Sequence, residues 1–236
     1  MVEVRALKGR SSSLTDQAYD QLEEMIVTLE LEPGAVLSEG ALATQLGLGR
    51  TPIREALQRL AREGLVVILP RKGILVAEIN PHNQLLVLEV RRELERLLAR
   101  TSAIRSTEEE RARFLKIAEG MEQAAREADD ISFMRLDYAL NMLVSQAAHN
   151  DYARRAIGLL HGMSRRFWYM HYKESADLPL CARLHAVLAR QIAEADPDGA
   201  AEASDRLVDY AETFTRATLD TGRLGHNLQD RSRAAP

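Results

Sequence analysis

The spacing of the hydrophobic residues changes at Gly64. Before it, apolar residues recur at every third or fourth position, whereas two short apolar runs follow it at 65–69 and 74–76. The tetrapeptide Pro-Arg-Lys-Gly at 70–73 separates these runs and is typical of a turn. The pattern therefore predicts helix before Gly64 and a two-stranded hairpin after it.

Three helices are predicted ahead of the hairpin. Gly49 is an acceptable N-cap for the third of them, and Pro52 falls in its first turn, where a missing N–H is harmless. The expected bounds are Ser12 or Ser13 to the Glu-Pro-Gly at 32–34, then 39–46, then 50 to 63–64. Three helices followed by a hairpin predict a winged helix-turn-helix.

The pattern after Pro81 is helical almost to the end of the chain. The expected helices lie near 81–104, 107–128, 131–148, 150–173, 177–195 and 199–221. The fold is therefore expected to be mainly α, with the winged helix-turn-helix at 1–78 and an all-α helical bundle at 79–224. The first ten residues are expected to form a loose arm, and 225–236 a flexible tail.

Charge is distributed unevenly along the chain. The net charge of the 236 residues is −4, yet the segment 50–72 carries six basic residues against two acidic ones. Such a patch suits contact with phosphates, and the acidic remainder disfavours indiscriminate binding. The single cysteine, Cys181, excludes an internal disulfide and is expected to fill a small apolar space. Without an apolar run of about 18 residues, a cytoplasmic protein with no membrane contact is expected.

The third helix and the hairpin tip combine the features of a DNA reader. Arg50, Thr51 and Arg54 share one face near the start of the helix, while Ile53 and Leu57 lie on the other. Arginine can bind guanine or phosphate with two hydrogen bonds, and a helix start favours phosphate. The hairpin tip adds three residues that can reach a flanking groove: Arg71, Lys72 and Gly73. The alternative is a solvated charged face beside a basic loop. The succession of turn, helix, hairpin and basic tip favours binding to double-stranded DNA.

These residues resemble the GntR family of bacterial regulators. The resemblance implies a homodimer on a short palindromic operator, with Arg50, Thr51 and Arg54 on the DNA and Gly73 at the groove. This family usually has Ser or Thr where the chain has Gly49, which implies a weaker grip on the DNA backbone. The matching motifs are Pro33-Gly34-x-x-Leu37-Ser38-Glu39, Leu42-Ala43-x-x-Leu46-Gly47 and Arg50-Thr51-Pro52-Ile53-Arg54-Glu55-Ala56-Leu57-x-x-Leu60-x-x-Glu63-Gly64-Leu65.

The helices after residue 80 resemble the effector domain of the FadR-type subfamily, called the FCD domain. The resemblance implies a helical bundle that encloses a pocket for a small molecule, often a carboxylate metabolite. It also implies a divalent metal held by an Asp, a His one turn later and two further His residues. The matching segments are Leu88-Glu89-Val90-Arg91-Arg92-Glu93-Leu94-Glu95, Leu136-Asp137-x-x-x-Asn141-x-Leu143 to Asn150, and Cys181 to Ala193 around His185.

The metal pattern is only partly present. Asp137 and His185 match two ligand positions, but Asn141 stands where the pattern has His, and Leu207 or Tyr210 occupies the fourth position. The resemblance implies one zinc-like or nickel or manganese ion at Asp137, Asn141 and His185. An amide is a poor ligand for zinc. The alternative is an Asp–His pair that is a structural hydrogen bond.

Four residues are expected to bind the effector: Arg91, Asn141, Arg165 and Tyr210. An interior Arg91 would supply the two-pronged donor that a carboxylate needs. The alternative is a surface pair with Glu95, four residues on. Arg165 lies in an aromatic segment near Trp168 that suits a pocket mouth, although such a segment also suits a core or a dimer interface.

The function that these features favour is a ligand-responsive, sequence-specific transcription regulator, a repressor that senses a small carboxylate. A regulator with a degenerate, metal-free pocket is the alternative within this class. The sequence offers no Gly-rich phosphate loop, no Gly-x-Ser-x-Gly and no catalytic Cys–His context, which argues against an enzyme. A helical interaction protein that does not bind DNA is the remaining rival, and operator footprinting separates it from a regulator.

Overall fold

The computed structural model describes residues 13–71 and 73–233, with side chains through 219. The chain divides into two compact units. The first contains the residues up to Ile79 together with His161–Met170, and the second contains Asn80–Leu160 and the residues from His171 on. The expected boundaries place the segment 161–170 in the helical bundle, whereas in the structure it belongs to the first unit. The expected N-terminal arm, Lys72 and the last three residues lie outside the described residues.

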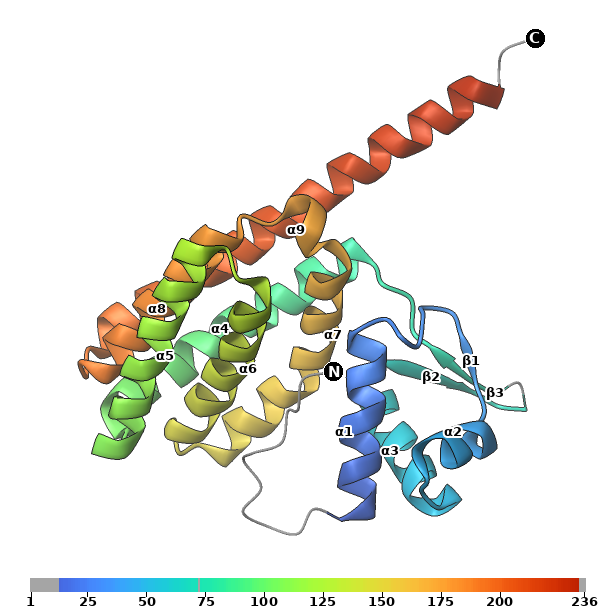
Figure 1. Ribbon diagram of the computed structural model, residues 1–236, viewed down its shortest axis with the longest axis horizontal. Coiled ribbons are helices and arrows are strands. Elements are labelled where there is room, and N and C mark those ends of the chain that lie inside the picture. The colour runs from blue at the N-terminus through green and yellow to red at the C-terminus, as the bar shows by residue number, and fades with distance from the viewer. Residues whose placement is uncertain (1–12, 72, 234–236) are drawn as a thin grey trace. The chain divides into compact units, whose positions relative to one another are not determined.

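Three helices open the first unit, as expected (Figure 1). They are α1 (Leu14–Val27), α2 (Glu39–Leu46) and α3 (Arg50–Arg62). Ser13 caps α1 in a reciprocal capping box with Asp16, which satisfies two backbone N–H groups at the helix start. The first helix ends earlier than the predicted Glu-Pro-Gly at 32–34, because the backbone leaves the helical region at Leu29, where φ is +63°.

The wing is a three-stranded antiparallel sheet in the order β1-β3-β2. The predicted hairpin is present as β2 (Val66–Leu69) and β3 (Gly73–Val76), with Leu69 opposite Gly73. The expectation of two strands was incomplete, because β1 (Val36–Leu37) pairs with β3. A strand of two residues is too short to show the alternation by which strands are predicted.

The core of the first unit lies between α1, α3 and the sheet. Its fully buried members include Leu22 and Ile26 from α1, Ile53 and Leu57 from α3, and Leu65, which directly precedes β2. The apolar stripe of α3 is thus buried, as its spacing predicted. The opposite face of α3 is consequently turned to solvent.

The second unit contains only helices among its described residues. They are α4 (Pro81–Arg105), α5 (Glu108–Glu127), α6 (Asp130–Ala147), α7 (Asp151–Ser175) outside its segment 161–170, α8 (Leu178–Ala193) and α9 (Pro197–Arg233). The starts of α4 to α8 are capped by the side chains of Asn80, Thr107, Asp129, Asn150 and Asp177. These caps explain why the breaks fall within one or two residues of the predicted ones. The last helix continues through Arg233, beyond the predicted end near 221 and into the segment expected to be a tail.

Helices α4 and α9 are tied together by ion pairs. Arg92 lies 2.7 Å from Asp209, and Arg96 lies 2.9 Å from Asp205. Ser102 on α4 also donates a hydrogen bond to the carbonyl of Val144 on α6 at 2.8 Å, which satisfies a buried hydroxyl. None of the described helices is both long enough and apolar enough to cross a membrane.

Leu57→Ala is expected to destabilise the first unit by about 2–5 kcal/mol, because the substitution leaves a cavity under α3. Leu57 is fully buried. Urea unfolding followed by circular dichroism measures the change. The control is the neighbouring exposed residue Gln58, whose replacement by Ala should change stability by less than about 0.5 kcal/mol. Equal effects of the two variants would contradict the burial of this face of α3.

Candidate nucleic-acid interface and effector site

The predicted DNA-contacting residues of α3 share its solvent face. Arg50, Thr51 and Arg54 are exposed, whereas Ile53 and Leu57 of the same helix are fully buried. Gly49 caps the helix through its extended backbone, with no side-chain hydrogen bond to the first turn. The first N–H groups of α3 therefore keep their capacity to bind a phosphate oxygen.

Arg54 is held in place by Glu39, a residue that the sequence analysis did not single out. The guanidinium Nη2 lies 2.7 Å from Glu39 Oε2 and Nε lies 3.0 Å from Oε1. This two-pronged bond holds the pKa of Glu39 below its ordinary value. The Arg54 side chain is still 60% exposed. The carboxylate therefore orients Arg54 without hiding it from a ligand.

Arg50 lies beside the same carboxylate. A Cβ built on Gly40 would lie 3.6 Å from Arg50 Nη2, so the guanidinium passes over the start of α2. The positive charge of Arg50 also contributes to lowering the pKa of Glu39. Glu39 thus stands between the two arginines expected to reach the DNA. The sequence signal for this contact was an acidic residue at the start of α2. It lies eleven positions before Arg50 and fifteen before Arg54.

The tip of the wing is exposed at both of its described site residues. Arg71 has a φ of +65° and Gly73 a φ of +106°. The second angle is far more accessible to glycine than to other residues, which explains the residue at this position. Lys72, the third residue expected at the tip, lies outside the described residues. The turn therefore presents Arg71 to solvent, as a wing contact requires.

A buried carboxylate anchors the end of α3 to α1. Glu63 is 6% exposed and accepts a hydrogen bond of 2.7 Å from the hydroxyl of Tyr19. Arg59 bonds to the same carboxylate and lies 3.5 Å above the centre of the Tyr19 ring. Burial, with help from Glu63, raises the pKa of Tyr19. Arg59 is therefore a structural arginine, unlike Arg50 and Arg54 at the other end of the helix.

Asp137, Asn141 and His185 converge in the helical unit, as the sequence analysis expected. His185 Nε2 lies 3.0 Å from Asp137 Oδ1, and Asn141 Nδ2 donates to the same oxygen at 3.0 Å. On its other side, His185 Nδ1 lies 2.7 Å from the carbonyl oxygen of Cys181. The three side chains belong to one connected cluster that joins α6 to α8. Their roles in binding stay a prediction.

The neighbours of His185 favour its charged form. Both ring nitrogens face oxygen acceptors, and an imidazole donates from both nitrogens only as the cation. Burial alone lowers the pKa of His185, but interactions with Cys181 and Asp137 outweigh it and raise the pKa well above its ordinary value. Burial raises the pKa of the Cys181 thiol and so disfavours its charged form, which makes the carboxylate of Asp137, 3.0 Å from Nε2, the stronger partner of a charged His185.

The donor set does not fit a tight zinc-like centre. Asp137 and His185 are strong ligands, but Asn141 offers an amide, and its nitrogen points at Asp137. No group of three His, Cys, Asp or Glu side chains that could hold a metal occurs among the described residues. A metal ion would also have to displace the proton that His185 Nε2 shares with Asp137. Metal binding at this cluster would therefore break bonds that the three side chains make to one another.

The other residues expected to bind the effector are engaged elsewhere. Arg91 lies 2.6 Å from Glu95, as in the alternative pairing, but both side chains are mostly buried and do not form a surface pair. Tyr210 donates to the carbonyl of Asp177 at 3.0 Å. Arg165 belongs to the first unit, where it lies 2.8 Å from Glu23, and its part in effector binding stays a prediction. Its aromatic neighbours in the sequence gave no hint of that partner on α1.

Cys181 has a larger part in the cluster than the sequence analysis assigned to it. It is 3% exposed, as a small apolar filler would be, but its carbonyl fixes His185. The ring of Phe133 packs edge-on against His185, with the centroids 5.5 Å apart. Residues four apart on one helix share a face. The spacing of Cys181 and His185 was therefore the sequence signal for the contact between these two residues.

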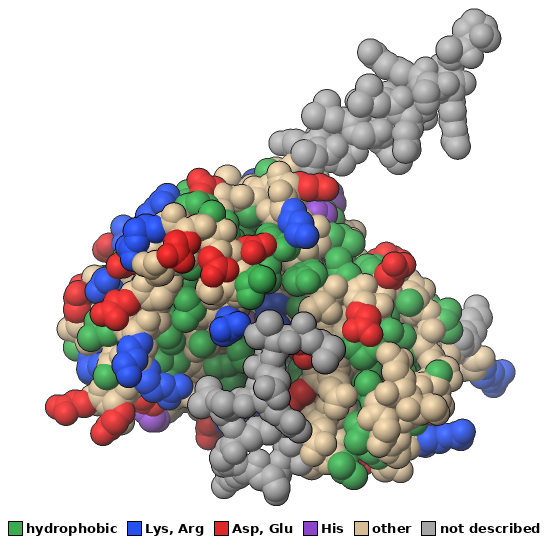
Figure 2. All heavy atoms as spheres, in the orientation of Figure 1, with side chains coloured by type: hydrophobic (Ala, Val, Ile, Leu, Met, Phe, Trp, Pro, Cys, Tyr) green, Lys and Arg blue, Asp and Glu red, His purple; other side chains and the backbone are tan. Residues whose placement is uncertain are grey.

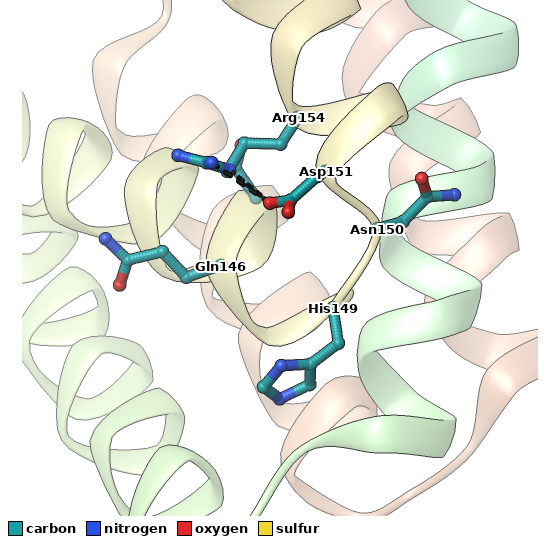
Figure 3. A pocket seen from close by; sticks show the side chains of 6 residues that line it. Gln146, His149, Asn150, Asp151 and Arg154 are labelled. Carbon is teal, nitrogen blue, oxygen red and sulfur yellow. Dashed lines mark hydrogen bonds and ion pairs between the residues drawn. The ribbon is translucent and has the colours of Figure 1, made fainter.

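A separate open pocket of about 350 Å³ lies where α6 ends and α7 begins. The residues that line it have polar or charged side chains and include Gln146, His149, Asn150 and Arg154 (Figure 3). Arg154 is paired with Asp151 at 3.0 Å. None of the residues expected to bind the effector lines this pocket. We therefore do not place the effector there.

Known proteins resemble the chain in both units. The sequence model of bacterial regulatory proteins, gntR family, matches residues 14–76, and that of the FCD domain matches 86–210. An uncharacterised HTH-type transcriptional regulator in an unstable DNA locus of Streptomyces ambofaciens is 51% identical over 63 residues, or 27% of either chain. The chain spans less than two thirds of the length of this relative and of two others.

Two relatives from Escherichia coli match over most of their length. The transcriptional regulator McbR is 26% identical over 75% of this chain and 80% of its own. Its solved structure has a TM-score of 0.76 at 21% identity, over 88% of this chain and 99% of that one, which shows the fold. The transcriptional repressor RspR is 26% identical over 78% of this chain and 81% of its own.

The FCD match alone covers more than half of the 236 residues, and the gntR match covers the unit that carries α3 and the wing. The proteins that share these domains are transcriptional regulators and not enzymes. The chain therefore belongs to the gntR family of bacterial regulatory proteins, and its helical part is an FCD domain.

Proposed function

We propose that the chain is a cytoplasmic, ligand-responsive repressor that binds a short palindromic operator as a homodimer. The observation that carries this proposal is the solvent face of α3, where Arg50, Thr51 and Arg54 stand together above a fully buried apolar face. Repression is supported by the relative RspR, a transcriptional repressor by name. On the face shown in Figure 2, the helical unit mixes acidic and basic side chains, so that face is not a basic surface for DNA.

The operator can be identified with the protein itself. Selection from a randomised duplex library should enrich a palindrome, because a two-fold protein reads two equivalent half-sites. Footprinting on the selected duplex then measures protection. A helical interaction protein that does not bind DNA would enrich no sequence.

Arg54→Ala is expected to abolish specific binding to the selected operator. Each lost contact to a base is worth about 1–3 kcal/mol, and a dimer loses two. Gel-shift titration measures the affinity, and circular dichroism checks that the fold is kept. Arg62→Ala is the matched control, because this exposed arginine lies at the far end of α3. An affinity of the Arg54 variant within about twofold of wild type would remove Arg54 from the interface.

A second copy of the chain is the partner that best fits α4. Four large apolar residues of this helix are exposed, and they lie on one stripe opposite its buried face: Leu86, Val90, Leu97 and Ile104. The last three are seven residues apart, the spacing with which helices pack along one seam. An antiparallel copy centred on Leu97 would place Val90 against Ile104 of the second copy. It would also bring Glu93 close to Arg100 of that copy, so the stripe complements itself in charge.

Leu97→Glu is expected to convert the dimer into a monomer, because it places a charge at the centre of the apolar seam. Light scattering coupled to size-exclusion chromatography at micromolar concentration measures the mass. Ile131→Glu is the control, since Ile131 is equally apolar and 62% exposed on α6. If the Ile131 variant dissociates and the Leu97 variant does not, the interface is on α6. A monomeric wild type, with or without operator, would exclude the dimer.

We also propose that the effector domain works without a tightly bound metal and takes a small carboxylate beside His185. The support is the cluster itself, in which Asn141 donates to Asp137 and His185 lies 3.0 Å from the same carboxylate, which helps to raise the pKa of the imidazole. A carboxylate could accept from the same two donors, His185 and Asn141. Arg91 would contribute only after release from Glu95.

Asn141→His is expected to create the third strong ligand that the cluster lacks. Three nitrogen and oxygen ligands are the minimum set of catalytic zinc sites, so zinc affinity should rise more than about tenfold over wild type. Titration with zinc in a calorimeter measures the affinity, and Asn141→Gln is the control for a loss of packing. A wild-type protein that retains stoichiometric zinc through dialysis would contradict the metal-free proposal.

A further inference from the structure

The segment His161–Met170 of α7 is built into the DNA-binding unit. A Cβ on Gly162 would lie 2.7 Å from Leu65 Cδ1, so the helix backbone contacts the fully buried first residue after Gly64. Met163 packs against the same hydrophobic core. Such a close approach needs glycine at 162, because any side chain there would push α7 away from Leu65. The segment is therefore part of the core that supports the wing.

Arg166 is the unusual residue of this segment. It is 4% exposed, and its guanidinium donates to two backbone carbonyls, to Ala77 at 2.8 Å and to Glu78 at 3.2 Å. No carboxylate bonds to it among the described residues, and its buried Nε has no hydrogen-bond partner there. Burial lowers the pKa of Arg166, partly offset by the nearby charge of Glu78.

Burying Arg166 in this way lowers the stability of the folded state. A buried charge is costly unless it is paired and fully hydrogen-bonded, and an apolar side chain of similar size would avoid the cost. Arg166 supplies something that an apolar residue cannot, which is a pair of donors for two consecutive carbonyls. We therefore expect Arg166 to hold the backbone at Ala77 and Glu78 and to do more than fill space in the core.

The two carbonyls lie at the base of the wing. Ala77 follows β3 directly, its N–H donates to the carbonyl of Leu65 at 3.0 Å, and the N–H of Val76 donates to the carbonyl of Ala35 at 2.9 Å. Arg166 therefore completes the bonding of Ala77, whose N–H and carbonyl are then both engaged. At the other end of β3, Gly73 forms the tip beside Arg71. Whatever fixes the base of this short hairpin also fixes the direction of its tip.

We propose that Arg166 is a positioning residue for the wing: by holding the carbonyls of Ala77 and Glu78, it aims Arg71 at the DNA. The inference rests on the proposed DNA-binding function. Arg166 is buried and does not itself contact DNA. It acts through the wing, whereas the contacts of Arg50 on α3 should not depend on it.

A double-mutant cycle on the full-length protein tests the proposal, with the duplex selected by the wild type as the probe. Arg71→Ala should weaken operator binding about tenfold in the wild type but less than about threefold in the Arg166→Gln background, because a misdirected wing has little contact left to lose. Arg50→Ala is the matched control and should cost the same factor, within about twofold, in both backgrounds. The salt dependence of binding should also become shallower in Arg166→Gln, as in Arg71→Ala.

Two further measurements keep the outcome decisive. Arg166→Lys keeps the charge but not the pair of donors, so it should fold and show a weaker version of the same coupling if Arg166→Gln fails to fold. Hydrogen exchange of the peptide around Ala77 should speed up in the variants. Additive effects of Arg166 and Arg71 on binding would overturn the proposal. A wild type that selects no duplex would instead overturn the proposed function, so the two failures are distinguishable.

Discussion

The burial of one face of α3 is the constraint on which the DNA-binding unit depends. Ile53, Leu57 and Leu60 are fully buried, and with them fixed the helix can present only its other face to solvent. Burying each such side chain favours folding by about 1.5–3 kcal/mol, more than any exposed ion pair on the helix supplies. The exposure of Arg50 and Arg54 is thus a consequence of apolar packing and does not need charge to maintain it.

The charges decide how that face is presented. Glu39 binds Arg54 through two hydrogen bonds and lies near Arg50 as well. A phosphate or a guanine edge offers Arg54 a similar pair of acceptors, so DNA binding exchanges one set of bonds for another. The loss of the bonds to Glu39 offsets part of the free energy that the new contacts of Arg54 supply. We therefore expect selectivity for sequence to depend on the orientation that Glu39 imposes on Arg54 in the free protein.

Local signals in the sequence predicted most of the elements and few of the contacts. The helix starts after residue 80 were predictable because Asn80, Thr107 and Asp129 cap within their own segments. The strand β1 was missed because its pairing with β3 spans almost forty residues. The partners of Arg165 and Arg166 lie more than eighty residues away. The spacing of apolar residues within one helix cannot predict such contacts. In the effector domain, the resemblance to a family predicted the meeting of Asp137 with His185, which spacing alone could not.

The closed cluster in the effector domain limits what an effector can gain there. Asp137 already accepts hydrogen bonds from His185 and Asn141, so a carboxylate that takes its place replaces bonds that exist. Such an exchange contributes little net free energy, because equivalent hydrogen bonds are lost and formed. Affinity would then have to come from apolar contacts of the effector, for which Phe133 beside His185 is suited. The displaced carboxylate of Asp137 would also need a new partner, so binding at this site would have to rearrange the junction of α6 and α8.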